Sequence, residues 1–357
     1  MTTKTALIAM SGGVDSSVAA HRMLQAGYAC TGVMMRLYQN EDLGLPVLGA
    51  CCSEHDIRDA EAVAARLGIP FRAVNLTREF RQDVMERFVR IYEQGETPNP
   101  CIDCNRYLKF DRLLRYALQQ GCDVLATGHY ARIEREPGGR YLLKKAADDT
   151  KDQSYVLYML TQEQLAHLCF PLGSLAKQEV RAIAAGLGFP NARKQDSQDI
   201  CFIPDGDYGA FLERERGAAY PEGDFLAEDG TVLGRHQGAA RYTIGQRRGL
   251  GISAAERLYV LGKDMARNTV TVGREEALFR RDVEVSACSW IALDRLTAPI
   301  RCRAKLRYRM PEQPCTLSPV GPDLVHITFD EPQRAPTPGQ AAVFYDGDIV
   351  LGGGTIV

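Results

Sequence analysis

Two cysteines lie three positions apart at the end of a proline-rich turn, in the stretch Thr97-Pro-Asn-Pro-Cys-Ile-Asp-Cys-Asn105. A thiolate is both a nucleophile and a metal ligand, so such a pair can bind a metal, cycle between dithiol and disulfide, or carry sulfur. Arg106 and Lys109 follow closely, and their positive charges would lower a nearby thiol pKa. Cys101 and Cys104 are therefore candidate reactive residues.

A third cysteine, Cys201, also follows loop signals, in Asp196-Ser-Gln-Asp-Ile-Cys-Phe-Ile-Pro204. One CxxC is half of a structural zinc site, but no second CxxC or HxxxH completes it. Cys51-Cys52 lacks the spacing, although it could contribute if the fold brings it close. Three cysteines without an obvious fourth ligand suit either an iron–sulfur cluster with one open iron or a pair of thiols that exchanges sulfur.

A glycine-rich turn near the N-terminus, Ser11-Gly-Gly-Val-Asp-Ser16, follows a predicted strand and opens a predicted helix. Glycines let the backbone approach an anion, and a helix N-terminus offers free N–H groups with a favourable dipole. The sequence has no GxxxxGK[ST] and no GxGxxG, which argues against a Walker-type triphosphatase and a dinucleotide fold. The turn is therefore either a plain β–α connection or a phosphate-binding loop.

The elements that must position these residues alternate along the first half of the chain. We expect strands at 6–10, 30–37, 70–76 and 123–127, and helices at 16–26, 55–67, 79–92, 108–119 and 177–188. This order predicts an α/β fold with a doubly wound parallel sheet, whose ligands bind beyond the carboxyl ends of the strands. A hairpin is expected around 134–143.

The composition and the hydrophobic pattern of the sequence change after about residue 205. Glycine and proline become frequent, and residues 283–357 read as short strands with turns. We therefore predict a catalytic domain at 1–205, a small central domain at 206–280 and a C-terminal β-barrel at 281–357.

The composition limits the class of protein. The first residues, MTTKTALIAM, have no cleavage-site pattern, and no apolar stretch reaches the roughly 18 residues of a membrane span. We expect a cytoplasmic protein with no membrane partner. The 11 cysteines are odd in number and irregularly spaced, which disfavours a secreted disulfide framework.

The net charge of −2 conceals a basic segment between residues 235 and 309, with 16 Lys+Arg against 7 Asp+Glu. Five cations in it alternate with other residues, so a strand would place all five on one face. Such a face is either a solvated sheet edge or a phosphate-binding surface, and the nearby basic turn 245–249 favours RNA phosphates. The five are Arg301, Arg303, Lys305, Arg307 and Arg309.

Taken together, the motifs identify a family. Over essentially its whole length the chain resembles the tRNA-uridine 2-sulfurtransferases (tRNA-specific 2-thiouridylases) of the PP-loop ATP-pyrophosphatase superfamily, which implies an adenine-nucleotide α-hydrolase-like first domain. The resemblance rests on SGGVDSSV (11–18), CCS (51–53), TPNPxxxCNxxxKF (97–110), ATGHYAR (126–132), KDQSYVLYML (151–160), DSQDICFIPDGDY (196–208), GRHQG…YTIGQRRGLGI (234–252) and RYR (307–309).

The resemblance implies a reaction. Such enzymes adenylate the C2 carbonyl oxygen of the wobble uridine in certain tRNAs and release pyrophosphate, and a sulfur nucleophile then displaces AMP to give 2-thiouridine. The implied cofactors are ATP and Mg²⁺, the latter placed with the help of Asp15. The implied partners are tRNAs for Lys, Glu and Gln, contacted in part by the central domain, and a sulfur-donor protein such as a cysteine desulfurase or sulfur relay protein.

The resemblance also implies residue roles, with Cys104 as the nucleophile and Cys201 as the residue that receives persulfide sulfur. The implied ATP-binding residues are Ile8, Ala9, Met10, Ser11, Gly12, Gly13, Val14, Asp15, Ser16, Met34 and Gly128. The implied tRNA-binding residues are Asn99, His129, Lys151, Asp152, Gln153, Tyr308, Arg309 and Gln340.

One departure from the family pattern affects the mechanism. Many members have Asp where this chain has Cys101, so the acid–base role of that residue is unfilled here or passes to Asp103. A CxxC with a distant third cysteine resembles the subgroup that holds a [4Fe–4S] cluster through three thiolates, here Cys101, Cys104 and Cys201. We favour this cluster over a persulfide relay, because three ligands with a vacant position suit a substrate sulfur.

Two other functions keep parts of this pattern. A related adenylating amidase or synthetase would use the same ATP loop with ammonia or an amino acid as the nucleophile. A non-catalytic, zinc-stabilised RNA-binding module would make the glycine-rich loop only a turn. Neither of them would depend on Cys104 or Cys201.

Overall fold

The computed structural model describes residues 3–38, 54–196, 200–321 and 323–357. The pair Cys51-Cys52 and residues 197–199, which precede Cys201, lie outside the described residues. Within the described ranges, no helix is long and apolar enough to cross a membrane.

The first part of the chain forms the predicted parallel sheet, in the order β3-β2-β1-β4-β7. Chain connections run from β1 outward to β3 and then return to the other side of β1 at β4, so the topological switch point lies between β1 and β4. Ligands bind outside the carboxyl ends of strands at such a point. The strands are β1 (Thr5–Ala9), β2 (Ala29–Arg36), β3 (Phe71–Asn75), β4 (Val124–Thr127) and β7 (Leu168–Cys169).

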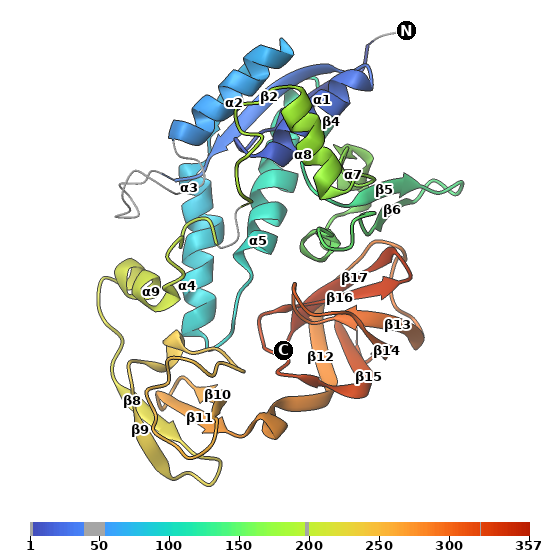
Figure 1. The fold of residues 1–357 in the computed structure, drawn as a ribbon. Helices are drawn as coiled ribbons and strands as arrows, with labels where there is room; N and C mark the ends of the chain where they lie inside the picture. Colours follow the sequence, from blue (N-terminus) through green and yellow to red (C-terminus); the bar gives the residue numbers. More distant parts are fainter. Residues whose placement is uncertain (1–2, 39–53, 197–199, 322) are drawn as a thin grey trace.

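Helices cover both faces of this sheet, as Figure 1 shows. Successive residues of a strand point to opposite faces, so Ile8 packs with α1 (Val14–Gln25), α2 (Glu54–Leu67) and α8 (Lys177–Gly186). Leu7 packs on the other face, with residues of the long helix that ends at Gln119. The doubly wound α/β prediction is therefore confirmed.

Two long helices carry wide, π-type turns in their middle. The first runs through α3 (Thr77–Phe80), a π segment (Arg81–Met85) and α4 (Glu86–Glu93). The second runs through α5 (Pro100–Asp103), a π segment (Cys104–Leu113) and α6 (Leu114–Gln119), and we call it the thiol helix.

The thiol helix begins eight residues earlier than the expected start at 108. The Asn99 side chain accepts a hydrogen bond from the Cys101 N–H at 3.2 Å, and Pro100 takes the first helical position. A side-chain acceptor at the N-cap followed by proline is a strong helix start. The CxxC pair therefore lies in the first turns of a helix.

Shorter elements follow the sheet. The predicted hairpin is present as β5 (Arg132–Arg135) and β6 (Tyr141–Lys144). A 3-10 turn (Ser154–Leu157) and α7 (Gln162–Ala166) precede β7, and α9 (Tyr208–Arg216) leads into the central unit. That unit is a four-stranded sheet in the order β10-β11-β8-β9. Its strands are β8 (Gly223–Leu226), β9 (Val232–His236), β10 (Tyr259–Asp264) and β11 (Thr269–Gly273).

The C-terminal strands form the predicted β-barrel. They follow the order β12-β15-β14-β13-β16-β17, and β12 also pairs with β17, which closes the sheet. The β5–β6 hairpin joins this sheet through β6 and β17, so a segment from the first half of the chain extends the barrel. The strands are β12 (Phe279–Trp290), β13 (Ile300–Lys305), β14 (Gln313–Pro319), β15 (Leu324–Arg334), β16 (Ala341–Asp346) and β17 (Ile349–Ile356).

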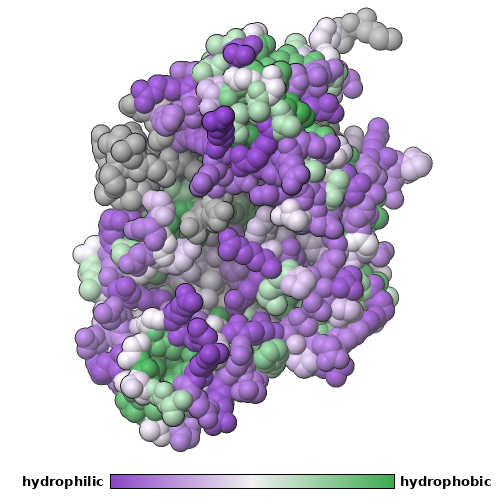
Figure 2. All heavy atoms as spheres, viewed as in Figure 1, coloured by the Kyte–Doolittle hydropathy of each residue, from purple (hydrophilic) through white to green (hydrophobic). Residues whose placement is uncertain are grey.

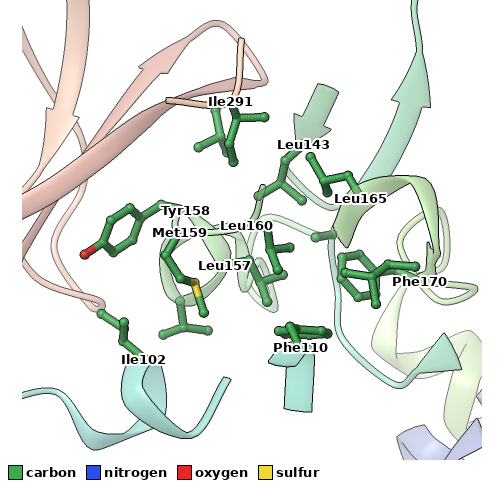
Figure 3. Packing of buried hydrophobic residues seen from close by; sticks show 14 of the residues in the cluster. Ile102, Phe110, Leu143, Leu157, Tyr158, Met159, Leu160, Leu165, Phe170 and Ile291 are labelled. Carbon is green, nitrogen blue, oxygen red and sulfur yellow. The ribbon is translucent and has the colours of Figure 1, made fainter. Parts of the chain in front are cut away.

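One hydrophobic cluster joins the barrel to the parallel sheet and the thiol helix. Figure 3 shows Ile102 of the thiol helix beside Tyr158 and Met159, with Ile291 of the barrel side across the cluster. Tyr155 is fully buried in the same cluster, and its hydroxyl donates to the Ala341 carbonyl of β16 at 2.8 Å. Shared burial of this kind fixes the barrel against the helix that carries the thiols.

The surface is mostly hydrophilic in the view of Figure 2, with apolar side chains gathered over the central unit. Val232 and Leu233 of β9 are among the exposed large hydrophobic residues. Both lie on an edge strand of the central sheet.

Candidate active site

The glycine-rich loop lies between β1 and α1, at the switch point of the sheet. Its shape is held by Ser16, whose hydroxyl accepts from the Ser11 N–H at 3.1 Å and donates to the Gly13 carbonyl at 3.1 Å. Gly12 has φ +71°, and a Cβ there would lie 2.5 Å from the Asp56 carbonyl oxygen. Only glycine fits such a position, so the loop can present backbone N–H groups to an anion.

The other residues with an implied ATP role line the same end of the sheet. A Cβ on Gly128, just after β4, would lie 2.8 Å from the Ser16 N, so this backbone packs directly on the start of α1. Met34 in β2 is buried. Ile8 and Ala9 form the end of β1, and Met10 and Val14 are buried beside the loop.

Asp15 lies in the first turn of α1 and is already bound by a cation. The Lys177 ammonium contacts both Asp15 carboxylate oxygens, at 2.7 and 2.8 Å, and the Tyr130 hydroxyl donates to Asp15 at 2.8 Å. Lys177 is buried, and it also pairs with Asp196 at 2.8 Å. This lysine therefore bridges the phosphate loop and the segment that leads to Cys201.

Asp196 is the centre of a network of three cations. Lys151 and Arg181 bind its carboxylate at 2.8 and 2.9 Å, in addition to Lys177. Burial alone would raise the pKa of Asp196, but the hydrogen bonds from Lys151 and Lys177 outweigh it and lower the pKa to about 2. Asp196 is therefore ionised at neutral pH, and the cations beside the phosphate loop are held in place.

Cys104 and Cys201 pack against one hydrophobic cluster. This cluster includes Phe80, Phe88 and Phe202, and both cysteines lie at its border, half buried. The Tyr38 hydroxyl donates to the Cys201 carbonyl at 2.7 Å, which ties this segment to the residues just after β2. The fold thus brings together two cysteines that are 97 positions apart in the sequence.

The surroundings of Cys104 favour a neutral thiol. Burial raises its pKa, the positive charge of Lys109 opposes this, and the negative charge of Asp103 adds to it. A thiol in such a setting reacts slowly until a base, a positive charge or a bound sulfur changes its state.

Cys101 faces a different neighbour. It is exposed, and its charge is one of the causes that raise the pKa of Tyr308, after burial and the charge of Asp152. Cys101, Asp152 and Tyr308 therefore lie near one another, at the junction of the thiol helix and the barrel.

The three cysteines do not form a ligand set. Among the residues that the structure describes, no group of three or more His, Cys, Asp or Glu side chains is arranged to hold a metal ion. A ligand set for the expected [4Fe–4S] cluster is therefore not seen among these residues, and the cluster stays a prediction. Asp103, the other candidate for the family's acid–base role, is buried and pairs with Arg87 at 3.2 Å, and burial raises its pKa.

The expected tRNA-binding residues fall into two groups. Lys151, Tyr308 and Arg309 keep surface that RNA can reach, whereas His129 is buried. The His129 ring lies between Phe110 and Phe170 and shares a 2.6 Å hydrogen bond with Thr127. Burial, and then Lys109, lower its pKa well below the ordinary value, so His129 is neutral.

The remaining candidates hold loops. Asp152 accepts from the Ala146 N–H at 3.0 Å, and Gln153 accepts from the Tyr130 N–H at 2.9 Å. The Gln340 amide donates to the carbonyls of Thr97 and Pro98, at 2.9 and 3.1 Å. A residue of the barrel therefore fastens the loop that leads into the CxxC pair.

The prediction that five cations share one strand face is wrong beyond Lys305, because β13 ends at that residue. Arg307 is instead directed inward, donating to the carbonyls of Ile244 and Ala335 and to the Thr337 hydroxyl. It joins the central unit to the barrel. Two of the others are paired with carboxylates, Arg301 with Asp330 and Arg303 with Glu312.

The sequence interpretation missed several polar residues beside the phosphate loop. Lys177 is the most direct, and Asn191 donates to the Gly12 carbonyl at 3.0 Å and to Ser17 at 2.9 Å. Lys194 reaches the same carbonyl at 3.3 Å and also binds Asp56 and Asp59. These residues follow no local motif, and only the folding of α8 and the following turn onto α1 brings them to the loop.

Comparison with known proteins places the chain in a family. Three family models match it in succession: a tRNA methyl transferase HUP domain over residues 4–205, a tRNA methyl transferase PRC-barrel domain over 209–274 and an aminomethyltransferase β-barrel domain over 280–356.

Curated relatives match along nearly the whole chain. A tRNA-specific 2-thiouridylase MnmA from Symbiobacterium thermophilum is 51% identical, over 99% of this chain and 92% of that relative. Proteins of the same name from Clostridioides difficile and Geotalea uraniireducens are 46% and 49% identical over 99% of this chain, and over 98% and 95% of their own lengths.

Solved structures are more distant. A 4-thiouridine synthetase–RNA complex with bound ATP has a TM-score of 0.36 at 19% identity, over 56% of this chain and 45% of that one. The NMN synthetase from Francisella tularensis has a TM-score of 0.31 at 19% identity, over 60% of this chain and 73% of that one. At these scores the likeness carries no further argument. The identities with the curated relatives do: the chain belongs to the family of tRNA-specific 2-thiouridylases.

Proposed function

We propose that the chain makes 2-thiouridine at the wobble position of tRNA by ATP-dependent adenylation followed by sulfur transfer from cysteine. Family membership makes it a tRNA-thiolating enzyme. The observation that carries the mechanism is the packing of Cys104 and Cys201 against one cluster in the domain that also holds the phosphate loop. We further propose that residues 1–205 are the ATP-binding catalytic domain, 206–280 contact tRNA and 281–357 are the barrel.

The first step is activation of the uridine. The C2 carbonyl oxygen attacks the α-phosphorus of ATP, a P–O bond forms, and pyrophosphate leaves with the electrons of the broken α–β bond. The backbone N–H groups of residues 12–16 and the Lys177 ammonium, which lies beside the loop at Asp15, would stabilise the leaving pyrophosphate. Mg²⁺ would supply charge neutralisation at the phosphates, and Asp15 is the carboxylate that fits it, because Mg²⁺ needs few protein ligands when phosphates complete its shell.

The second step is sulfur transfer. A donor protein leaves a persulfide on Cys201, and its terminal sulfur attacks C2, which expels AMP. The Cys104 thiolate then attacks the Cys201 sulfur, so the S–S bond breaks and 2-thiouridine leaves. The resulting Cys104–Cys201 disulfide takes two electrons from an external thiol reductant to restart the cycle. We propose this relay in place of the cluster because the described residues offer no three-thiolate ligand set.

The proposed partners are tRNAs for Lys, Glu and Gln and a cysteine desulfurase or sulfur relay protein. Tyr308, Arg309 and Lys151 would contact the RNA through their exposed surface. Asn99 and Gln340 would act on it through the loop that they hold. An amidase or synthetase with the same loop would have no use for two cysteines on one cluster.

Substituting Cys104→Ser or Cys201→Ser should reduce 2-thiouridine formation to background while tRNA-dependent pyrophosphate release continues, because adenylation precedes sulfur attack. Both products are measured in one assay, by nucleoside mass spectrometry and a coupled pyrophosphate reaction. Cys122→Ser is the matched control, since Cys122 precedes β4 at the other end of the sheet. Thiolation at the wild-type rate in either variant would contradict the relay.

Replacing Lys177 by Met should weaken ATP binding about tenfold or more, because a charge-assisted contact to phosphate is lost and Asp15 and Asp196 keep their negative charges. Calorimetric titration with a non-hydrolysable ATP analogue measures this, with Lys177→Arg as the charge-conserving variant and exposed Lys4→Met as control. Unchanged affinity in Lys177→Met would remove this lysine from the phosphate site.

Protein purified without oxygen should carry iron and inorganic sulfide well below one cluster per chain, and Cys101→Ser should thiolate tRNA within a few-fold of the wild-type rate. Iron and sulfide analysis of the purified protein tests the first expectation, and nucleoside mass spectrometry of the tRNA product tests the second. A full [4Fe–4S] complement that disappears in Cys101→Ser would restore the cluster mechanism.

A further inference from the structure

A cavity of about 450 Å³ lies between α4, the thiol helix and the C-terminal barrel. Three arginines contribute to its wall: Arg87 and Arg90 of α4, and Arg106 of the thiol helix. The barrel side is supplied by Gly339, Ala341 and Thr355. We call it the arginine cavity.

The arginine cavity lies behind the reactive thiols. Asn99, Ile102, Asp103 and Arg106 line it, and their spacing of three and four residues places them on one face of the thiol helix. Cys101 and Cys104 are not part of the lining and belong to the other face. The cavity wall also contains no residue of the phosphate loop, so the cavity is separate from that loop.

The charges in the cavity leave two arginines for a ligand. The Arg87 guanidinium is committed to Asp103, at 3.2 Å, and also lies over the Tyr107 ring. Glu96, the other acid of the wall, lies near Lys263, where burial lowers the lysine pKa to about 8 and the charge of Glu96 opposes that shift. Arg90 and Arg106 form no ion pair within 4.0 Å among the described residues, but the charges of both act on the Asp103 carboxylate, and both side chains are at least partly exposed.

Two guanidinium groups in a cavity of this size suit a phosphate with its attached sugar, because the planar fork of arginine matches phosphate oxygens. A helix with its side chains is about 10 Å across. The sugar–phosphate chain of RNA covers this distance within a few nucleotides, so one RNA strand can reach both sides of the thiol helix. We propose that the arginine cavity binds a backbone phosphodiester of the substrate tRNA close to the modified uridine, and that Arg90 and Arg106 are its ligands.

This placement would give the thiol helix a second task. The RNA backbone would bind on the side of the helix that faces the arginine cavity, and the uridine would bind on the side that carries Cys104. The same helical turn would then be contacted from both sides. Phosphate contacts fix register without reading sequence, so the cavity would set the position of the uridine relative to Cys104. The proposal rests on the proposed function, since it needs tRNA as substrate.

The test compares the wild type with the double variant Arg90→Ala/Arg106→Ala, which leaves the Arg87–Asp103 pair intact. Binding of unmodified tRNA is measured by filter retention over a series of salt concentrations. We expect an affinity loss of about tenfold or more, and a plot of log K against log salt that is shallower by about one. Affinity for the ATP analogue should not change.

Two further variants make the result specific. Arg22→Ala/Arg58→Ala removes two exposed arginines from α1 and α2 and should leave tRNA binding and its salt dependence within twofold of wild type. Arg90→Lys/Arg106→Lys keeps both charges without the planar fork and should fall between the wild type and the alanine variant. Circular dichroism and thermal melting establish that each variant is folded.

The outcomes separate this inference from the proposed function. Suppose that the wild-type protein thiolates tRNA, and that the alanine variant binds tRNA with the same affinity and salt dependence as the wild type. This result would overturn the inference and leave the proposed function intact. In another case, the alanine variant binds tRNA like the wild type while its thiolation reaction is no longer inhibited by added inorganic pyrophosphate. That result would assign the cavity to the free product and would also overturn the inference. A wild type that never thiolates tRNA would instead contradict the proposed function.

Discussion

The burial of the thiol helix between the parallel sheet, the barrel and the aromatic cluster around Phe88 is the constraint on which the rest of the structure depends. One side of the helix contributes Ile102 to the cluster shared with the barrel, while Cys104 and Leu108 meet the aromatic cluster around Phe88. Its start is capped by Asn99, and the preceding loop is tied to Gln340 of the barrel. A thiol on such a helix has little freedom, so the substrate must be brought to it, as preorganised catalysis requires.

A second constraint is electrostatic. Lys177 holds Asp15 at the phosphate loop and Asp196 at the start of the Cys201 segment, and thereby links the two halves of the reaction through one ammonium group. ATP brings several negative charges to the phosphate loop. The Lys177 ammonium can therefore exchange a carboxylate for a phosphate and still be paired with a negative charge. The same group that stabilises the empty site is thus available to the nucleotide.

Local sequence patterns were sufficient to predict the α/β domain, because its strands and helices alternate in a regular order. The order of alternating strands and helices in the first half of the chain predicted the parallel sheet and its ligand-binding edge, and the structure has both. The start of the thiol helix was predicted too late, because the Asn99-Pro100 cap was interpreted as a continuation of the turn. Contacts made only by tertiary packing, such as Lys177 with Asp15, Arg307 with Ala335 and Gln340 with Thr97, carry no local signal. The five-cation face failed for the same reason, since alternation alone cannot reveal that β13 ends at Lys305.

The central claim is that the fold holds the sulfurs of Cys104 and Cys201 within reach of each other beside the ATP loop. The most direct measurement is mild diamide oxidation of the folded Cys101→Ser protein, followed by peptide mass spectrometry without reduction. The account predicts that the peptides of Cys104 and Cys201 are joined by the dominant new disulfide. If Cys104 stays reduced, or joins another cysteine, while the protein remains folded and thiolates tRNA, the account is contradicted.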